Sequence, residues 1–214
     1  MNPDVLVHEQ AIDIMISTLH NSEGNAVVGP KIINIDGSIA NFINTSLTYK
    51  DFLKEKQSIK KIIEFFEKEK KEKEILPNTC SKINGMVSGC CFAIKGNIFK
   101  NIKYFDDNVF LYCEETILWE KLQKLNKNNK VIYEPLAEIE HRESTAIGGW
   151  VKPFSRRCYA ISLLYYQCQY RNLKGFKLLF AKLITKIDYI LISWKLHQDY
   201  KSEYVKLKKQ LKDF

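Results

Sequence analysis

Residues 114–141, EETILWEKLQKLNKNNKVIYEPLAEIEH, contain the helix and strand signals that decide the fold class. The part that begins at Glu114 predicts a helix, and its two leading acids suit the positive N-terminal end of a helix dipole. Val131–Pro135 then predicts a short strand, and the AEIEH that follows predicts another strand, which leads into a glycine-rich loop. Helix and strand signals in this succession predict an α/β protein.

The chain before this stretch carries the same mixture of signals. Apolar residues at mixed three- and four-residue spacing predict a helix over residues 5–20, for which Asp4 would be the ordinary N-cap. Residues 26–35 predict a strand interrupted by Gly29-Pro30. The sequence also predicts a solvated Lys/Glu-rich helix, a buried strand with small central residues, and a short helix or turn, at residues 51–74, 85–95 and 97–101.

Charge separates the chain into two expected domains. Residues 151–214 hold 14 Lys and Arg against 4 Asp and Glu, whereas the whole chain has 33 against 25. We therefore expect a slightly acidic α/β domain over residues 1–150 and a basic helical tail over residues 151–214. Apolar residues from Phe176 to Trp194 step by one or three positions, which predicts an amphipathic helix with one apolar face.

The N-terminus and the cysteines indicate the compartment. The first residues have neither the basic start nor the apolar run of a secretory signal. The longest uncharged run of the tail, 13 residues between Arg157 and Arg171, is shorter than the roughly 18 that a membrane-spanning helix needs. We expect a cytoplasmic protein with reduced thiols and no structural zinc site, because no two cysteines form a C-x-x-C pair. The six cysteines are Cys80, Cys90, Cys91, Cys113, Cys158 and Cys168.

Glu114 and Glu115 are the candidates for acid–base chemistry. They follow an aromatic-rich loop, and both desolvation and a neighbouring like charge raise the pKa of a carboxyl group. One of the two could then accept a proton near neutral pH. Taken singly, such a pair is more often a pair of helix N-terminal charges, and a lone histidine such as His141 is more often structural.

The order of the motifs adds a resemblance to a known family. NPDV, VVGPKIINIDGS, GMVSGCCFAIKGNIF, an aromatic loop with EETILWEKLQK, a KVIYEP strand and AEIEHRESTAIGG follow one another along residues 1–150. In this order the chain resembles the second half of family 2 glycosyltransferases of the rhamnosyltransferase-like kind. The resemblance implies a truncated GT-A fold, in which two Rossmann-like halves abut in the complete enzyme. It also implies inverting sugar transfer from a nucleotide-sugar donor to a glycan or lipid-linked acceptor in surface polysaccharide synthesis.

The resemblance implies a metal site at the N-terminus. Asn2-Pro3-Asp4 matches the family's DxD-like motif, so Asp4 is expected to bind a divalent Mg²⁺ or Mn²⁺ on the donor diphosphate. Such ions prefer oxygen ligands and offset the charge of a leaving diphosphate. His141 matches a histidine that approaches the metal or the diphosphate. Asn2 and Trp150, the latter at the end of the glycine-rich loop, are expected to contact substrate.

Two further segments match the sugar and acceptor sides of the family's site. Gly89, Cys90 and Cys91 correspond to a small-residue strand that lines the sugar site. Glu114 and Glu115 correspond to the acidic pair on the acceptor side. The resemblance makes Glu115 the expected base that deprotonates the acceptor hydroxyl.

The chain also departs from the family's pattern. The family commonly has an Asp three residues and an Arg seven residues after the first acid, where this chain has Ile117 and Lys121. Lysine keeps the charge but lacks the bidentate fork of arginine. The segment that carries the nucleotide-base pocket in the family would precede the NPD motif. We therefore expect a truncated or split enzyme whose nucleotide-binding half is missing or made separately.

The basic tail suits the surface of an anionic membrane. Lysines flank the apolar face of the expected helix, and Trp194 and several tyrosines suit the interface between lipid and water. We expect a peripheral protein at the inner face of the cell membrane, which would serve a lipid-linked acceptor. The alternative is that this apolar face packs back on the body of the protein or forms a helical hairpin.

Three hypotheses for the function remain open at this point. The first is a glycosyltransferase or a fragment of one. The second is a non-catalytic, membrane-associated subunit that binds the acceptor and complements a separate nucleotide-binding half. The third, a nucleic-acid binder, rests only on the basic tail, and no nucleic-acid partner is expected, because the basic residues alternate with long aliphatic ones and no DNA- or RNA-binding motif occurs.

Overall fold

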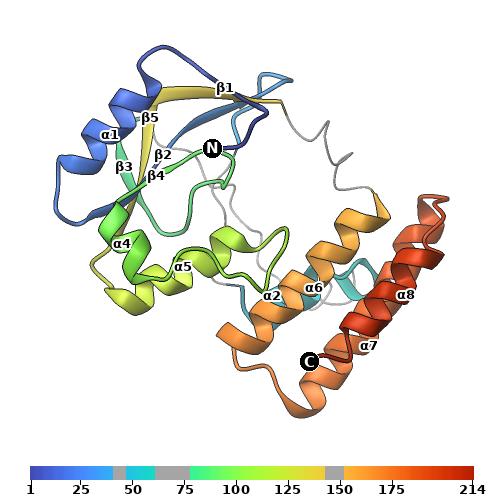
Figure 1. Ribbon diagram of the computed structural model, residues 1–214. Coiled ribbons are helices and arrows are strands. Elements are labelled where there is room, and N and C mark those ends of the chain that lie inside the picture. The colour runs from blue at the N-terminus through green and yellow to red at the C-terminus, as the bar shows by residue number, and fades with distance from the viewer. Residues whose placement is uncertain (41–46, 61–77, 143–151) are drawn as a thin grey trace. The chain divides into compact units, whose positions relative to one another are not determined.

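The computed structural model describes residues 1–40, 47–60, 78–142 and 152–214. Within them the chain forms two compact units, of which the first is built around a sheet and the second from helices (Figure 1). The first unit contains β1 (Val5–Val7), α1 (Ala11–His20), β2 (Asn25–Asn34), β3 (Ser81–Ile83), β4 (Ala93–Ile94), α4 (Gly96–Asn101), α5 (Glu114–Leu125) and β5 (Lys130–His141). The second contains α2 (Tyr49–Lys54), the segment Asp107–Cys113, α6 (Pro153–Tyr170), α7 (Gly175–Lys195) and α8 (Lys201–Gln210).

A five-stranded mixed sheet organises the first unit, with β2 and β5 at its centre. These two strands run parallel to each other. On its other edge β5 pairs antiparallel with β3 near its start and with β1 near its end, and β4 pairs antiparallel with β2. Because β5 is 12 residues long, one of its edges has room for two short strands in succession.

A bulge interrupts the pairing of the two central strands at their prolines. The register steps from Pro30 opposite Glu134 to Lys31 opposite Glu138. Proline has no N–H to donate to a ladder, and an irregular register is where a strand tolerates it. The sequence predicted two strands separated at Pro135, whereas the structure forms the single strand β5 with the bulge at that place.

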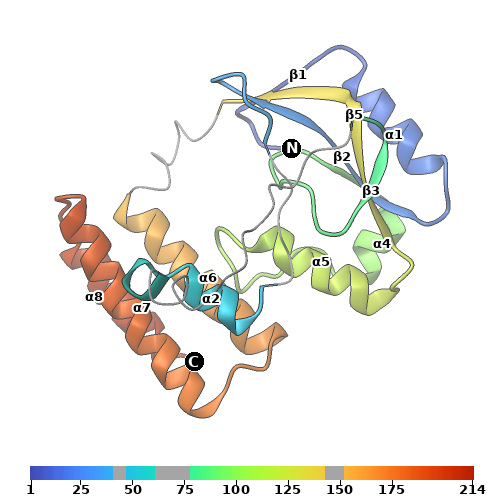
Figure 2. The same cartoon turned by 180° about the vertical axis from the view of Figure 1, so that it is seen from behind.

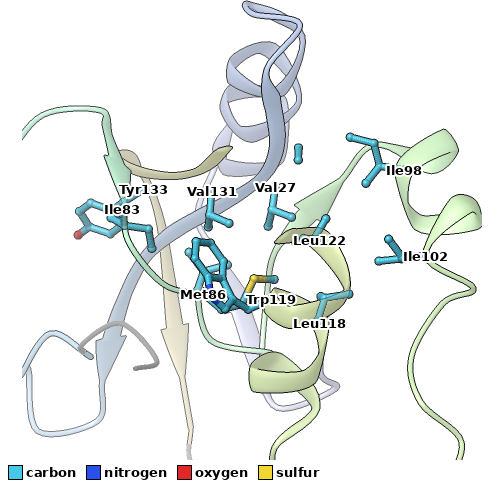
Figure 3. Packing of buried hydrophobic residues seen from close by; sticks show 12 residues of the cluster. Val27, Ile83, Met86, Ile98, Ile102, Leu118, Trp119, Leu122, Val131 and Tyr133 are labelled. Carbon is cyan, nitrogen blue, oxygen red and sulfur yellow. The ribbon is translucent and has the colours of Figure 1, made fainter. Parts of the chain in front are cut away.

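Helices cover both faces of the sheet. Successive residues of a strand point to opposite faces, and Val27 and Val28 accordingly belong to two different clusters of buried side chains. Val28 packs with Met15 and Leu19 of α1. Val27 packs on the opposite face, against α4 and α5, with the buried α5 side chains Leu118, Trp119 and Leu122 (Figure 3).

The second unit is a packed group of helices. α6, α7 and α8 pack on one another and α2 packs on α6 (Figure 2). The Nε of Arg157 on α6 pairs with Glu203 Oε2 on α8 at 2.6 Å, and the Tyr189 hydroxyl on α7 donates to the Pro153 carbonyl at 2.9 Å. The fully buried leucines at its centre are Leu163, Leu164 and Leu207.

The structure confirms the α/β class as a mixed sheet with helices on its two faces. The helix that was expected from Glu114 begins at that residue, and the strand expected at residues 26–35 is β2. Glu114 and Glu115 occupy the first turn of α5, where their charges suit the helix dipole.

The structure also corrects several expectations. Residues 5–7 form strand β1 instead of the start of a helix, because they pair with the end of β5. α1 begins only at Ala11, so Asp4 is not its N-cap. Of the strand expected at residues 85–95, only Ala93–Ile94 is a strand. The strand β3, at Ser81–Ile83, precedes this range, where no strand was expected.

The Lys/Glu-rich helix expected at residues 51–74 is interrupted near its start, at Glu55 and Lys56, and residues 57–60 are helical again. α2 ends at Lys54, and Glu55 caps it with its backbone N–H. A capping box between Thr48 and Asp51 fixes its beginning. The part of that expectation beyond residue 60 lies outside the described residues.

The longest helix in the described residues is α7, with 21 residues. Lys177, Lys182, Lys186 and Asp188 interrupt its apolar residues. Across the described part of the chain, no helix combines the length and the apolar character that crossing a membrane requires.

The close approach of Gly29 to Val87 generates a stability prediction. A methyl group at position 29 would overlap the Val87 side chain, which is itself buried. We expect Gly29→Ala to lower the free energy of unfolding of the first unit by about 2 kcal/mol, because a close-packed core has no room for an added carbon. Urea unfolding followed by circular dichroism measures the change.

Gly96→Ala is the matched control, because a new Cβ at that position meets no atom within 4 Å. It should be neutral or slightly stabilising. A Gly29→Ala protein as stable as the parent would contradict this packing.

Candidate active site

Strand pairing brings three distant segments of the first unit together. β1 pairs with the end of β5, so Val5 lies opposite His141, and the N–H of Arg142 donates to the Asp4 carbonyl at 3.1 Å. The N–H of Asn2 donates to the carbonyl of Cys90 at 2.7 Å. The NPD segment is therefore held between the end of β5 and the Gly89–Cys91 segment.

Asp4 and His141, the two residues expected to bind metal, are neighbours. The His141 Nε2 lies 3.5 Å from Asp4 Oδ2, and both side chains are partly buried. The other carboxylate oxygen, Asp4 Oδ1, is buried and has no hydrogen-bond partner among the described residues. An imidazole nitrogen beside an unpartnered carboxylate oxygen is a donor set that a divalent cation can use. No group of three or more His, Cys, Asp or Glu side chains that could hold a metal occurs in the described residues.

Glu115 is held by the backbone of Gly89. The Gly89 N–H donates to Glu115 Oε1 at 2.8 Å, and a Cβ at position 89 would lie only 2.6 Å from the same oxygen. Any side chain at position 89 would therefore push the carboxylate away. The glycine, 26 residues earlier in the sequence, fixes where the Glu115 carboxylate lies.

Burial raises the pKa values of both acids of the pair, and for Glu114 the neighbouring charge adds to it. Desolvation first, and then the charge of Glu115, raise the pKa of Glu114 to about 7. Desolvation also raises the pKa of Glu115, although the hydrogen bond from Gly89 opposes the shift. The Glu114 Oε2 atom is buried without a hydrogen-bond partner in the described residues. A carboxyl group with such a pKa can exchange a proton near neutral pH.

Cys90 lies within the electrostatic reach of both groups of acids. Burial is the main cause that raises the pKa of its thiol, and the charges of Glu115 and Asp4 raise it further. The thiol is therefore neutral at physiological pH and sits near both carboxylates. The hydrogen bond from Asn2 to Cys90, the one from Gly89 to Glu115, and the neighbouring side chains of Asp4 and His141 make the four segments that carry these residues neighbours in the first unit.

The remaining expected residues have different surroundings. Cys91 is 1% exposed and packs with Cys90 in the buried cluster beneath α1. Burial raises the pKa of the Cys91 thiol. Asn2 is exposed and is held through its backbone. Trp150 lies outside the described residues.

The two departures from the family's pattern have local explanations. Ile117 is 1% exposed, so a carboxylate at this position would lose its water without an evident partner. Lys121 donates through its Nζ to the carbonyl of Tyr104 at 3.0 Å, which ties α5 to the end of the α4 segment. Both residues therefore serve the packing of α5.

The backbone turn directly before α5 was not predicted from the sequence. Tyr112 and Cys113 have positive φ angles of 70° and 65°, directly before Glu114. A residue with a Cβ in this region costs about 1 kcal/mol or more, and such strain gathers at functional sites. Neither position carries the glycine or asparagine that usually marks a left-handed turn, so no local signal could have revealed it.

Two ion pairs near the end of β5 were not predicted from the sequence either. His8 Nε2 lies 3.3 Å from Glu140 Oε1, and Lys31 Nζ lies 2.6 Å from Glu138 Oε1. The hydrogen bond from Lys31 lowers the pKa of the Glu138 carboxyl group. The alternation of Glu138 and Glu140 in the sequence AEIEH could have shown that they share one face of a strand.

Comparisons with known proteins leave the family open. No model of a known protein family matches the chain, and no match is found among curated proteins. The resemblance to family 2 glycosyltransferases therefore remains a prediction from motifs, and the function must be argued from the geometry of the site.

The raised pKa of Glu114 predicts a pH-dependent loss of stability. Because the folded state holds this proton up to about pH 7 and the unfolded state only to about pH 4.5, the folded state binds more protons between these values. The contribution of Glu114 to stability therefore falls as the pH rises through this window. Between pH 4.5 and pH 8, we expect the free energy of unfolding of Glu114→Gln to rise relative to that of the parent by on the order of 2 kcal/mol.

Urea unfolding at several pH values measures the difference between the variant and the parent. Glu9→Gln, an exposed change in the same unit, is the control and should leave that difference independent of pH. A flat difference for Glu114→Gln as well would show that folding does not raise the pKa of its carboxyl group.

Proposed function

We propose that the first unit is part of a metal-dependent glycosyltransferase, which transfers a sugar from a nucleotide-sugar donor to a glycan or lipid-linked acceptor in surface polysaccharide synthesis. The observation that carries this proposal is the convergence, in one unit, of the four segments that contain Asp4, Cys90, Glu115 and His141. Each was selected from a different motif, and their segments lie up to 137 residues apart in the chain. Convergence of this kind supports a single site over four unrelated coincidences.

Glu115 is the base in this proposal. Its carboxylate would take the proton of the acceptor hydroxyl while that oxygen attacks the anomeric carbon and the bond from this carbon to the diphosphate breaks. Because its pKa is raised, the Glu115 carboxylate is a stronger base than an ordinary glutamate. The Gly89 N–H holds one carboxylate oxygen, which restricts its orientation. Inversion at the sugar carbon is the outcome implied by the resemblance.

Asp4 and His141 would hold the divalent cation. A bound Mg²⁺ or Mn²⁺ supplies positive charge that offsets the charge of the leaving diphosphate. The unpartnered Asp4 Oδ1 is the protein atom best suited to such an ion. The diphosphate and water would supply the remaining ligands, since Mg²⁺ is usually bound by one or two carboxylates together with phosphate oxygens and water.

The second unit would bring the enzyme to an anionic membrane surface. α7 leaves a row of apolar side chains exposed, from Phe176 at 81% to Trp194 at 62%. The helix carries lysines beside this row, and residues 151–214 have a strong positive balance. An exposed apolar face with flanking lysines suits an anionic interface. The row consists of Phe176, Leu179, Phe180, Leu183, Ile187, Leu191 and Trp194.

The same exposed face favours a second candidate function. A membrane-associated subunit that only binds the acceptor, and works beside a separately made nucleotide-binding half, would need this face but no base. The role of Glu115 distinguishes the two candidates.

Donor binding tests the catalytic proposal. We expect one of the UDP-, GDP-, dTDP- or CMP-sugars to raise the melting temperature of the protein in the presence of Mn²⁺, because a ligand of the folded state stabilises it. Asp4→Asn should abolish the dependence on Mn²⁺. Glu115→Gln should keep the donor shift but lower transfer to an acceptor by about a hundredfold or more.

Ser17→Ala, an exposed change on α1, serves as the control for both variants. Unchanged transfer in Glu115→Gln would refute the base assignment. A protein that melts cooperatively and responds to none of the donors would favour the acceptor-binding subunit.

Membrane binding is tested by flotation with phosphatidylglycerol vesicles. Phe176→Gln and Trp194→Gln should each weaken binding by about tenfold, because each removes a large apolar side chain from the interface. Val205→Gln, an equally exposed apolar residue on α8, is the control and should bind as the parent does. Binding should also weaken as salt is added. Retention on DNA with no binding to vesicles would overturn this assignment.

A further inference from the structure

The second unit contains a cavity of about 350 Å³ that the proposed active site does not use. It lies between residues 54–60, α6 and α7, all within that unit. Five basic and two acidic side chains line it, so its formal charge is positive. The basic ones are Lys54, Lys56, Lys60, Arg156 and Lys195, and the acidic ones are Glu55 and Asp188.

Lys56 is buried in the wall of this cavity, with only 4% of its surface exposed. Burial lowers the pKa of its ammonium group to about 8, although the charges of Asp188 and Glu55 oppose the shift. Its Nζ lies 4.6 Å from the centre of the Phe52 ring. This cation–π contact replaces only part of the hydration that the ammonium group loses on burial. Burying an ammonium group is costly unless an anion accompanies it.

Arg156 provides a second buried cation with unused donors. It is 6% exposed, and its Nη2 donates to Ser193 Oγ and to Gln198 Oε1, each at 3.0 Å. Its Nε and Nη1 are buried and have no hydrogen-bond partner among the described residues. Thr185 also lines the cavity, and its buried hydroxyl has no hydrogen-bond partner among the described residues either. Donors of this kind are rarely left unsatisfied in a folded protein.

Asp188 supplies only part of the negative charge that these cations require. Its charge acts on both Lys56 and Arg156. Its Oδ1 is occupied as the acceptor of a hydrogen bond from the Ser58 N–H at 3.0 Å. Asp188 is therefore the one buried carboxylate of the lining beside two buried cations, and the other acid, Glu55, is exposed, so a further anion in the cavity would balance the charge.

We propose that this cavity binds a phosphate group. A phosphate offers several acceptor oxygens with multiple negative charge, and it matches the fork of donors that a guanidinium presents. The volume of about 350 Å³ is that of a small-ligand site. The group can belong to a free phosphorylated molecule or to a lipid headgroup, since α7 carries both this cavity and the exposed apolar row. The proposal does not depend on the glycosyltransferase activity.

Isothermal titration calorimetry with inorganic phosphate and glycerol 3-phosphate tests the soluble source, and flotation with phosphatidic acid vesicles tests the lipid source. Lys56→Met is the main variant, because methionine fills the same space without a charge and should leave the fold as stable as before or more so. We expect it to weaken binding by about tenfold or more in the arm that responds. Arg156→Lys, which keeps the charge but loses the fork, should weaken binding as well.

Lys209→Gln is the matched control, because it removes one exposed lysine of the same unit outside the cavity. A response to the soluble phosphates that Lys56→Met loses and Lys209→Gln keeps would support a free ligand. A loss confined to the vesicles would support a lipid headgroup. No response of the parent in either arm, or equal weakening by Lys56→Met and Lys209→Gln, would overturn the proposal.

Discussion

The parallel pairing of β2 with β5 is the interaction on which the first unit depends. β1 and β3 attach to the free edge of β5, and β4 attaches to β2, so no other strand has a place without this pair. The pair also sets which side chains face α1 and which face α5, because a strand sends successive residues to opposite faces. Val27 and Val28 show this directly, since each joins a different buried cluster.

The candidate active site is a consequence of that sheet. The end of β5 recruits β1, and this places Asp4 beside His141. α5 packs on the opposite face from α1, and its first turn brings Glu115 to the Gly89 N–H. The residues of the site therefore lie at strand ends and at the start of a helix. At such places some backbone N–H and C=O groups have no partner within the helix or sheet and can bind other groups.

The second unit distributes its side chains in an unusual way. Lys56 and Arg156 are buried, while Phe176 and Trp194 on α7 are largely exposed. A protein that only needed to fold would bury the aromatic residues and expose the basic ones. This inverted arrangement at two places in one unit is the observation on which the membrane and phosphate proposals rest.

The sequence by itself determined the α/β class, the helix that begins at Glu114 and the choice of candidate residues, because these follow from local periodicity, helix-end charge and the order of motifs. Only the tertiary structure decided that residues 5–7 are a strand, since their partner lies more than 130 residues away. It likewise decided that Gly89 holds Glu115 and that Lys56 is buried. Pairing and burial depend on residues far apart in the chain, and no local pattern contains that information.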